Sequence, residues 1–302
     1  MMSPSLSIVI PSYARADLLT RCLETVTRFA PSATEVIVVD DASRSAIISQ
    51  TADRFPGVRV IRLAKRSGFC IAANTGVQAA TGDVVELLND DTEVTLGWAD
   101  AAVRWFVDPT IAAVAPLVLQ NDLARRSHGQ FPRIDSAGDE YDPGGFARKR
   151  GHGHPMKPDS LSGLAEKRLN EPGPVWGVSA AAGFYRRNVF LAVGGFPEHF
   201  GAYFEDVDLS FRLRHAGFET WYDPESLVWH RVSATYGKRP GRRTLMQQSC
   251  NEERVFWRNV PQQADKNYLF RHLLVLAGKA LRRMEEGSLA PWTLGRIQAA
   301  IT

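Results

Sequence analysis

The sequence predicts an α/β fold built on a mostly parallel sheet with helices on its faces. Short apolar runs alternate with segments of helical periodicity between Ser7 and Leu119, and this alternation indicates βαβ units, whose strands run parallel. Two of these runs end in adjacent carboxylates, Asp40-Asp41 and Asp90-Asp91. Open α/β sheets bind ligands at the carboxyl ends of their strands, so the two acidic ends predict a single crevice along one edge.

The elements of this first part follow from the residue pattern. Compact apolar runs rich in β-branched residues predict strands at Ser7–Ile10, Glu35–Val39, Val58–Leu63, Val84–Leu88 and Ile111–Leu119. Apolar residues at helical spacing predict the helices between them, at Leu18–Ala30 with Asp17 as its N-cap, Ala46–Phe55, Ile71–Ala80 and Trp98–Val107.

From Gln120 to Pro174 the composition shifts to Gly, Pro, Arg, Lys and His. We expect long loops with short strands here, which are typical of lids and substrate-binding segments. His152 and His154 occupy alternate positions and could bind a metal. No cysteine or acidic residue accompanies them in the local sequence, so a solvated loop is the alternative.

The segment from Val175 to His230 predicts further strands and helices. Strands are expected at Val175–Tyr185, Thr220–Tyr222 and Leu227–His230, and a short helix at Arg187–Val193. Another helix is expected to begin at Glu205 and Asp206, beside several aromatic residues. These carboxylates could simply stabilise the helix N-terminus. Alternatively, they could supply a general base next to aromatic walls that bind a sugar-like ligand.

After Pro240 the chain becomes helical and basic. Helices are predicted at Thr244–Asn259 and Asn267–Arg283, and the second carries an apolar stripe with Arg271, Lys279, Arg282 and Arg283 nearby. This segment could contact an anionic membrane surface. The alternative is a helix that packs on the domain and keeps its other face in solvent.

The bulk composition excludes several classes of protein. The 302 residues carry a formal net charge of +3, which does not indicate a nucleic-acid partner. Cys22, Cys70 and Cys250 are widely spaced and form no zinc motif, so we expect a reducing compartment rather than disulfides. No signal-peptide pattern and no long apolar run occur. We therefore expect a cytoplasmic protein, which could also associate peripherally with the cytoplasmic face of the membrane.

An ordered set of motifs resembles the family 2 glycosyltransferases of the GT-A fold. The motifs are Ser7 to Tyr13, Val38 to Ser43, Gly68-Phe69 with Asn74 to Gly76, Gly82-Asp83 leading to Asn89-Asp90-Asp91, Gly194 to Phe196, Glu205 to Arg212 and Trp229-His230. The resemblance covers about residues 5 to 235. It divides the chain into a nucleotide-sugar-binding half (1–119), an acceptor-binding and catalytic half (120–235) and a C-terminal helical extension (236–302).

The resemblance implies an inverting, metal-dependent transfer of a sugar from a nucleotide diphosphate sugar, such as a UDP- or dTDP-sugar, to an acceptor hydroxyl. The acceptor would be a glycan or a lipid-linked glycan in the assembly of bacterial cell-surface polysaccharide. The implied metal is Mn²⁺ or Mg²⁺, which suit carboxylate, phosphate and imidazole ligands.

The resemblance also implies roles for individual residues. Asp206 would be the general base, and Glu205 would orient it or the acceptor hydroxyl. Asp91 and His230 would bind the metal. Asn89 stands where the family often has Asp, and it is not assigned to the metal. The donor nucleotide would be bound by Pro11, Tyr13, Asp40, Arg66, Asn74 and Asp90, with Asp40 at the base and Asp90 at the ribose.

Two other functions stay open on the residues alone. A sugar nucleotidyltransferase also uses an α/β sheet and acidic metal ligands. It would need a Gly-rich, basic signature after the first strand, which Ser12-Tyr13-Ala14-Arg15 does not supply. The other alternative is a non-catalytic module that binds a sugar nucleotide or a glycan. Such a module would have no need for Asp91, Asp206 and His230 together.

Overall fold

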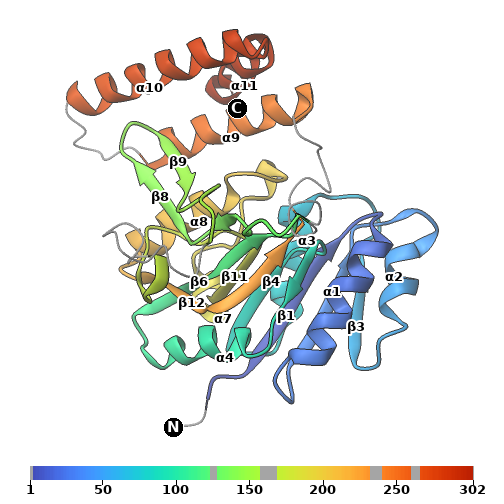
Figure 1. Cartoon of the computed structure of the whole chain (residues 1–302). Coiled ribbons are helices and arrows are strands. Elements are labelled where there is room, and N and C mark those ends of the chain that lie inside the picture. The colour runs from blue at the N-terminus through green and yellow to red at the C-terminus, as the bar shows by residue number, and fades with distance from the viewer. Residues whose placement is uncertain (1–2, 123–127, 157–168, 232–239, 260–265, 302) are drawn as a thin grey trace.

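A computed structural model of the chain describes residues 3–122, 128–156, 169–231, 240–259 and 266–301. The body is a twisted sheet with helices on both faces, and the C-terminal helices form a separate layer beyond the carboxyl ends of β1 and β4 (Figure 1). None of the helices within these ranges is long and apolar enough to cross a membrane.

The first part of the chain is a run of βαβ units, as predicted. Strand β1 pairs in parallel with both β2 and β4, and β2 pairs in parallel with β3. The elements are β1 (Leu6–Ser12), α1 (Ala16–Phe29), β2 (Glu35–Asp40), α2 (Ile47–Ala52), β3 (Val58–Arg62), α3 (Phe69–Ala79) and β4 (Val84–Leu88). One detail of the prediction is wrong. Helix α1 begins at Ala16 after Arg15, so Asp17 lies in the first turn and is not the N-cap.

The rest of the sheet is mixed. Its strand order is β10-β12-β6-β11-β4-β1-β2-β3, with β5 on β12 and β7 on β6. Strand β11 runs antiparallel to β4 and β6. The strands are β5 (Thr92–Val94), β6 (Ile111–Gln120), β7 (Ile134–Ser136), β10 (Gly173–Pro174), β11 (Ala182–Arg186) and β12 (Glu219–His230), and β8 (Asp139–Asp142) forms a separate hairpin with β9 (Phe146–Lys149). The helices are α4 (Trp98–Val103), α7 (Arg187–Ala192) and α8 (Glu205–His215), with 3-10 turns at Arg104–Val107 and Glu198–Phe200.

Two strand predictions differ from the structure. The expected strand Val175–Tyr185 forms only from Ala182, because the chain before it leaves the sheet and the Ala180 N–H donates to Asp206. Conversely, the two runs Thr220–Tyr222 and Leu227–His230 belong to one strand, β12, with an irregularity between Asp223 and Leu227. Pro224 falls in this irregular part, where a residue without an N–H is tolerated.

Each face of the sheet carries its own apolar cluster. Strand β1 illustrates this, because Val9 packs into one cluster while Ile8 and Ile10 pack into the other. Helix α3 covers the first cluster and α1 covers the second. Burial on both faces explains why the strands read as nearly continuous apolar runs. Strands from both predicted halves, 1–119 and 120–235, share this one sheet, and the functional division between the halves stays a prediction.

The C-terminal layer contains one more helix than predicted. Helices α9 (Arg242–Asn259) and α10 (Lys266–Glu285) match the two expected helices, and α11 (Leu289–Ile301) follows. Helix α11 was not predicted, because it contains Pro291 and Gly295, two residue types that usually interrupt a helix. Pro291 sits in the first turn, where a missing N–H has no cost. Gly295 allows close packing on α9, because a Cβ there would lie 2.2 Å from the Met246 carbonyl oxygen.

Candidate active site

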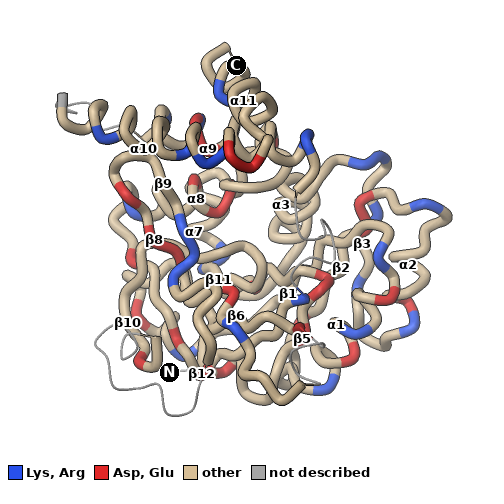
Figure 2. The backbone as a smooth tube through the Cα atoms, turned by 45° about the horizontal axis from the view of Figure 1, so that its top comes forward, with Lys and Arg blue, Asp and Glu red and all other residues tan. Residues whose placement is uncertain are grey.

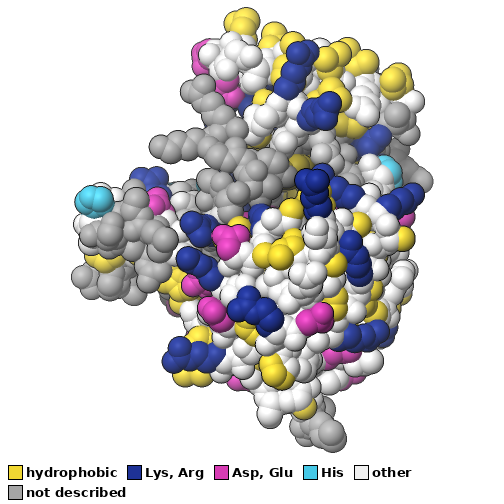
Figure 3. Space-filling model, turned by 90° about the vertical axis from the view of Figure 1, so that its right-hand side faces the viewer, with side chains coloured by type: hydrophobic (Ala, Val, Ile, Leu, Met, Phe, Trp, Pro, Cys, Tyr) yellow, Lys and Arg dark blue, Asp and Glu magenta, His cyan; other side chains and the backbone are white. Residues whose placement is uncertain are grey.

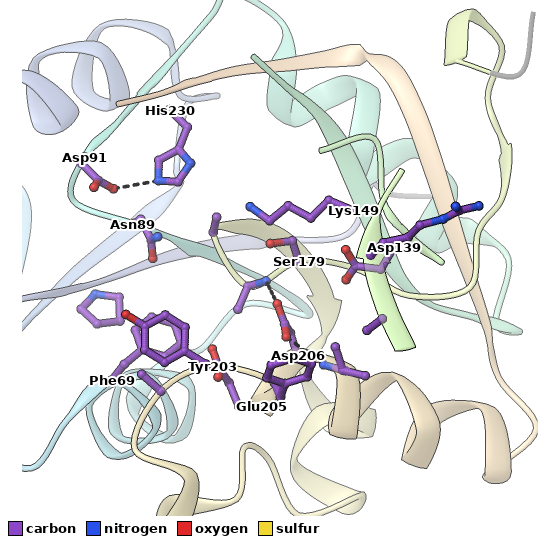
Figure 4. Close-up of a pocket in the computed structure, with 18 of the residues that line it drawn as sticks. Phe69, Asn89, Asp91, Asp139, Lys149, Ser179, Tyr203, Glu205, Asp206 and His230 are labelled. Atoms are coloured by element: carbon purple, nitrogen blue, oxygen red, sulfur yellow. Dashed lines mark hydrogen bonds and ion pairs between the residues drawn. The ribbon is translucent and has the colours of Figure 1, made fainter. Parts of the chain in front are cut away.

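A cavity of about 480 Å³ opens at the carboxyl edge of the sheet. Its walls come from the ends of β1, β4 and β12, from hairpin β8–β9 and from the turn that leads into α8. Figure 4 shows Asp91 and His230 on one side of the cavity, Glu205 and Asp206 on the opposite side, and Lys149 reaching between them. Of the predicted site residues, the cavity brings together Pro11, Asp91, Glu205, Asp206 and His230.

The first wall is built around Asp91. Pairing of β5 with β12 places His230 opposite Thr92, so Asp91 Oδ1 lies 3.2 Å from His230 Nε2. The other oxygen, Oδ2, lies 3.1 Å from Arg15 Nη1. Burial raises the pKa of Asp91, but His230 and Arg15 outweigh this effect and lower the pKa below its ordinary value. Asp91 is therefore a stable carboxylate inside the cavity wall.

Asp135 holds the second nitrogen of His230. Its Oδ2 lies 3.0 Å from His230 Nδ1 and 2.9 Å from Lys149 Nζ. Burial lowers the pKa of His230, but hydrogen bonds to Asp135 and Asp91 outweigh it and raise the pKa to about 9. A carboxylate on the far nitrogen is the usual second-shell partner of a metal-binding histidine. The sequence did not mark Asp135, because it lies in a segment without periodicity. His152 binds the Asp135 backbone carbonyl through Nδ1 at 2.8 Å rather than entering the cavity.

The donor atoms of this wall suit a divalent cation that arrives with its substrate. Within the described ranges, no three His, Cys, Asp or Glu side chains form a metal-binding group of their own. Asp91 supplies a carboxylate oxygen, and His230 supplies an imidazole nitrogen at the same point once a cation displaces its Nε2 proton. Mn²⁺ and Mg²⁺ accept such partial protein ligation when phosphate and water fill the remaining positions. These residues therefore fit the predicted metal.

Asp90 lies behind this wall and is fully buried. Its Oδ2 accepts a 2.6 Å hydrogen bond from Ser12 Oγ, and its Oδ1 pairs with Arg15. Burial raises the pKa of Asp90 to about 6 despite these partners. Both oxygens bind groups of the protein, and the predicted contact of Asp90 with ribose stays a prediction.

The remaining predicted nucleotide residues divide into two kinds. Tyr13 and Arg66 form a stacked pair, with the guanidinium carbon 4.0 Å from the ring centroid. Asp40 and Asn74 instead hold the fold together. Asp40 is fully buried and accepts bonds from the Ser43 N–H at 2.7 Å, from Ser49 Oγ at 2.6 Å and from Arg62 at 2.6 Å.

Asn74 makes a closed pair of hydrogen bonds with Phe196. Its Nδ2 donates to the Phe196 carbonyl and its Oδ1 accepts from the Phe196 N–H, both at 2.8 Å. This pair ties α3 to the Gly194–Phe196 turn. The nucleotide contacts predicted for Asp40 and Asn74 stay predictions, and their present partners give both residues a structural role.

The second wall contains three carboxyl groups, of which Glu205 and Asp139 are buried and Asp206 is half-buried. Asp206 accepts the N–H groups of Ala180 at 3.1 Å and Val207 at 2.9 Å. Glu205 Oε2 is buried and has no hydrogen-bond donor among the described residues. Burial raises the pKa of Asp206, and burial together with the charge of Asp206 raises that of Glu205 well above its ordinary value. Burial, followed by the charge of Asp206, raises the pKa of Asp139 to about 8.

The turn before α8 is strained. Tyr203 and Phe204 have φ values of 71° and 65°, a left-handed conformation that costs non-glycine residues about 1–3 kcal/mol each. Asn251 of α9 stabilises this turn. Its Nδ2 lies 2.9, 2.9 and 3.0 Å from the carbonyl oxygens of Phe200, Ala202 and Tyr203. The C-terminal extension thus fixes the turn that aims Glu205 and Asp206 into the cavity, which the sequence pattern did not predict.

The fold is that of solved GT-A glycosyltransferases. GalNAc-T7 with UDP, GalNAc and Mn²⁺ superposes with a TM-score of 0.65 at 21% identity, over 88% of this chain and 50% of that one. Mannosyltransferase PcManGT from Pyrobaculum calidifontis, in complex with GDP-Man and Mn²⁺, superposes with a TM-score of 0.60 at 18% identity, over 100% of this chain and 87% of that one. These superpositions confirm the predicted GT-A fold.

The chain belongs to glycosyl transferase family 2, whose profile matches residues 7–190. It is 27% identical over 255 residues to the N-acetylglucosaminyl-diphospho-decaprenol L-rhamnosyltransferase of Mycobacterium tuberculosis, over 79% of this chain and 80% of the relative. It spans between 25% and 42% of the length of three other curated relatives. The prediction that the protein is a glycosyltransferase is confirmed.

Proposed function

We propose that this protein transfers a sugar from a nucleotide diphosphate sugar to an acceptor hydroxyl, with inversion at the anomeric carbon and with help from a divalent cation. The proposal rests on one observation: two pairs of side chains face each other across one cavity. Asp91 and His230 face Glu205 and Asp206. The first pair can bind the metal and diphosphate of a donor, and the second can take a proton from an acceptor.

Asp206 acts as the general base in this proposal. Two backbone N–H groups stabilise its carboxylate, while burial keeps its pKa raised. A base of raised pKa accepts a proton more readily at neutral pH. Burial of Glu205, together with the charge of Asp206, favours the protonated form of Glu205. Its free oxygen can then hydrogen-bond the acceptor.

Asp91 and His230 would hold the cation, which when bound supplies Lewis-acid stabilisation of the departing diphosphate. Asp135 keeps the His230 ring oriented with Nε2 toward Asp91. Because the metal-binding wall and the base lie on opposite sides of the cavity, the acceptor hydroxyl can approach the anomeric carbon from the face away from the diphosphate. This approach inverts the configuration with a single base.

The donor and acceptor classes are also part of the proposal. A UDP- or dTDP-sugar follows from the motif resemblance, and one solved neighbour was crystallised with UDP. The acceptor would be a glycan or lipid-linked glycan of the cell surface, in line with the name of the mycobacterial relative. The three cysteines are buried free thiols, which supports the proposed location in the reducing cytoplasm.

Incubation with a panel of UDP-, dTDP- and GDP-sugars and Mn²⁺ tests the proposed reaction. A glycosyltransferase releases the nucleoside diphosphate, by transfer or by slow hydrolysis of the donor. A sugar nucleotidyltransferase would release pyrophosphate when given a sugar phosphate and a nucleoside triphosphate. A binding module would release neither product, and that result would overturn the proposal.

A further inference from the structure

One face of α10 exposes large apolar side chains. They recur at helical spacing, so they form a single stripe along the helix. The exposed fractions are 42% for Leu269, 60% for Phe270, 61% for Leu273, 56% for Leu274, 60% for Leu281 and 59% for Met284. Helix α11 adds Leu294, Ile297 and Ile301, which are 45%, 54% and 77% exposed. Apolar side chains gather along the top of Figure 3, over the C-terminal helices.

The opposite face of α10 anchors the helix to the protein. The His272 ring stacks on Phe256 at a centroid distance of 3.6 Å, and its Nδ1 lies 2.8 Å from the Gly144 carbonyl oxygen. Lys279 pairs with Glu252 and lies over the Phe146 ring at 4.6 Å. Because these contacts hold α10 in place, the exposed stripe is not needed for the core. A stripe of this size on a soluble surface indicates a binding face.

The charge of this part of the chain identifies the kind of partner. Residues 236–302 contain twelve Lys or Arg and five Asp or Glu, a formal net charge of +7, so residues 1–235 carry −4. Arg271 and Arg282 are exposed on α10, and Glu285 is the only acidic residue of that helix. Figure 2 shows Lys and Arg positions recurring along α10.

We propose that the apolar stripe of α10 docks this protein onto the surface of an anionic lipid membrane. An amphipathic helix with a large apolar face and flanking arginines lies in the interface, where apolar burial and attraction to anionic lipids add together. A second copy of the chain is a poorer partner. A two-fold interface places the same patch of both subunits face to face, so it would bring the two basic flanks together.

Membrane docking would also place the cavity near the lipid surface. The β8–β9 hairpin links the two, because Gly144 at its tip is held by His272 of α10 while Lys149 lines the cavity. An acceptor carried on a lipid would then meet the base without leaving the membrane. This consequence for the acceptor rests on the proposed function, whereas the docking itself does not.

Co-sedimentation of the full chain with lipid vesicles tests the docking without donor or acceptor. The wild type should bind vesicles of an equal mixture of phosphatidylcholine and phosphatidylglycerol more tightly than phosphatidylcholine alone. High salt should weaken this binding, because the Debye length falls from about 10 Å at 0.1 M to about 3 Å at 1 M. The double variant Leu273→Glu/Leu281→Glu should bind at least about tenfold more weakly, since each change puts a carboxylate where apolar surface meets the lipid.

The double variant Leu96→Glu/Val107→Glu is the matched control. These side chains are 80% and 61% exposed and flank α4, at the end of the molecule away from α10 (Figure 1). Its vesicle binding should equal that of the wild type, and both double variants should keep the wild-type melting temperature. The proposal is overturned if the wild type does not bind anionic vesicles, or if the α10 variant binds them as tightly as the wild type. If the wild type forms a dimer and does not bind vesicles, and the α10 variant is monomeric, the stripe would be assigned to contact with a second copy.

Discussion

The carboxyl groups of the two walls of the cavity have pKa values that are shifted in opposite directions. Asp91 and Asp135 each face cations, and their pKa values lie below the ordinary range despite burial. Glu205 and Asp139 are also buried and Asp206 is half-buried, but the charge of Asp206 acts on the other two, and desolvation raises the pKa values of all three. The same chemical group therefore has opposite pKa shifts on the two walls. In the proposed reaction, one wall keeps the negative charge that would bind a cation, and the other would exchange a proton with the acceptor.

Removal of the base should have the largest effect. The Asp206→Asn variant keeps the shape of the side chain but cannot take a proton, so kcat should fall by about 10²–10⁴-fold. Donor affinity should stay near the wild-type value, because Asp206 belongs to the wall away from the metal pair. Steady-state kinetics together with calorimetric donor titration would check both parts. Turnover near that of the wild type would remove Asp206 from this role.

The Asp91→Ala variant tests the charged wall in the same way. It should weaken Mn²⁺-dependent donor binding by more than about 100-fold, because loss of a ligand exceeds the usual cost of losing a supporting residue. Binding of the donor without metal should change little. Titration of the donor with and without Mn²⁺ provides the measurement. Equal affinities for the two proteins in Mn²⁺ would contradict the assignment of Asp91 to the metal.

Asp135→Asn tests whether the charged wall depends on its supporting carboxylate. The variant keeps a hydrogen bond to His230 Nδ1 but loses the charge that also pairs with Lys149. Mn²⁺ affinity should fall by about 10–100-fold. Calorimetric titration of Mn²⁺ in the presence of a nucleoside diphosphate would show this loss. A variant with wild-type Mn²⁺ affinity would mean that packing alone orients the His230 ring.

The smallest expected effect concerns Glu86, whose carboxyl group lies outside the cavity. Burial raises the pKa of Glu86 from 4.5 to about 8, despite hydrogen bonds from Trp98 Nε1 at 3.0 and 3.2 Å. Between these values the folded state keeps a proton that the unfolded state has lost. Wild-type stability should therefore decrease as pH rises from about 5 to about 8, by at most about 1.4 kcal/mol per pH unit from this group.

The Glu86→Gln variant lacks this titration. Its melting temperature should exceed that of the wild type by a margin that grows toward pH 8 and stays constant above it. Thermal unfolding of both proteins across this pH range would measure the margin. Parallel curves would show that burial alone does not raise carboxyl pKa values in this fold, and would weaken the same argument for Asp139.

The sequence predicted the parallel strands and their acidic ends, because periodicity and turn residues are local signals. The meeting of Asp91 with His230 depends on the antiparallel pairing of β5 with β12, which no local pattern reveals, and only the family resemblance suggested it. Asp135 and Asp139 were missed because they lie in a segment that reads as loop. Pairing of β7 with β6 brings Asp135 behind His230, and pairing of β8 with β9 brings Asp139 to the cavity. Asp40 shows the opposite limit. The motif identified Asp40 as a site residue. Its hydrogen bonds, however, come from Ser49 and Arg62, which lie farther along the chain and which the motif does not include.

The hydrogen bonds of Asn251 have a consequence for how this protein is made. The strained turn at Tyr203 and Phe204 precedes α9 in the chain, yet Asn251 of α9 stabilises it. Helix α9 in turn packs on α11 through Gly295 and through the hydrogen bond from Ser249 Oγ to the Trp292 carbonyl. A ribosome therefore releases every residue of the cavity before the turn gains its support. The turn that aims Glu205 and Asp206 into the cavity therefore gains the hydrogen bonds of Asn251 only after α9 has left the ribosome.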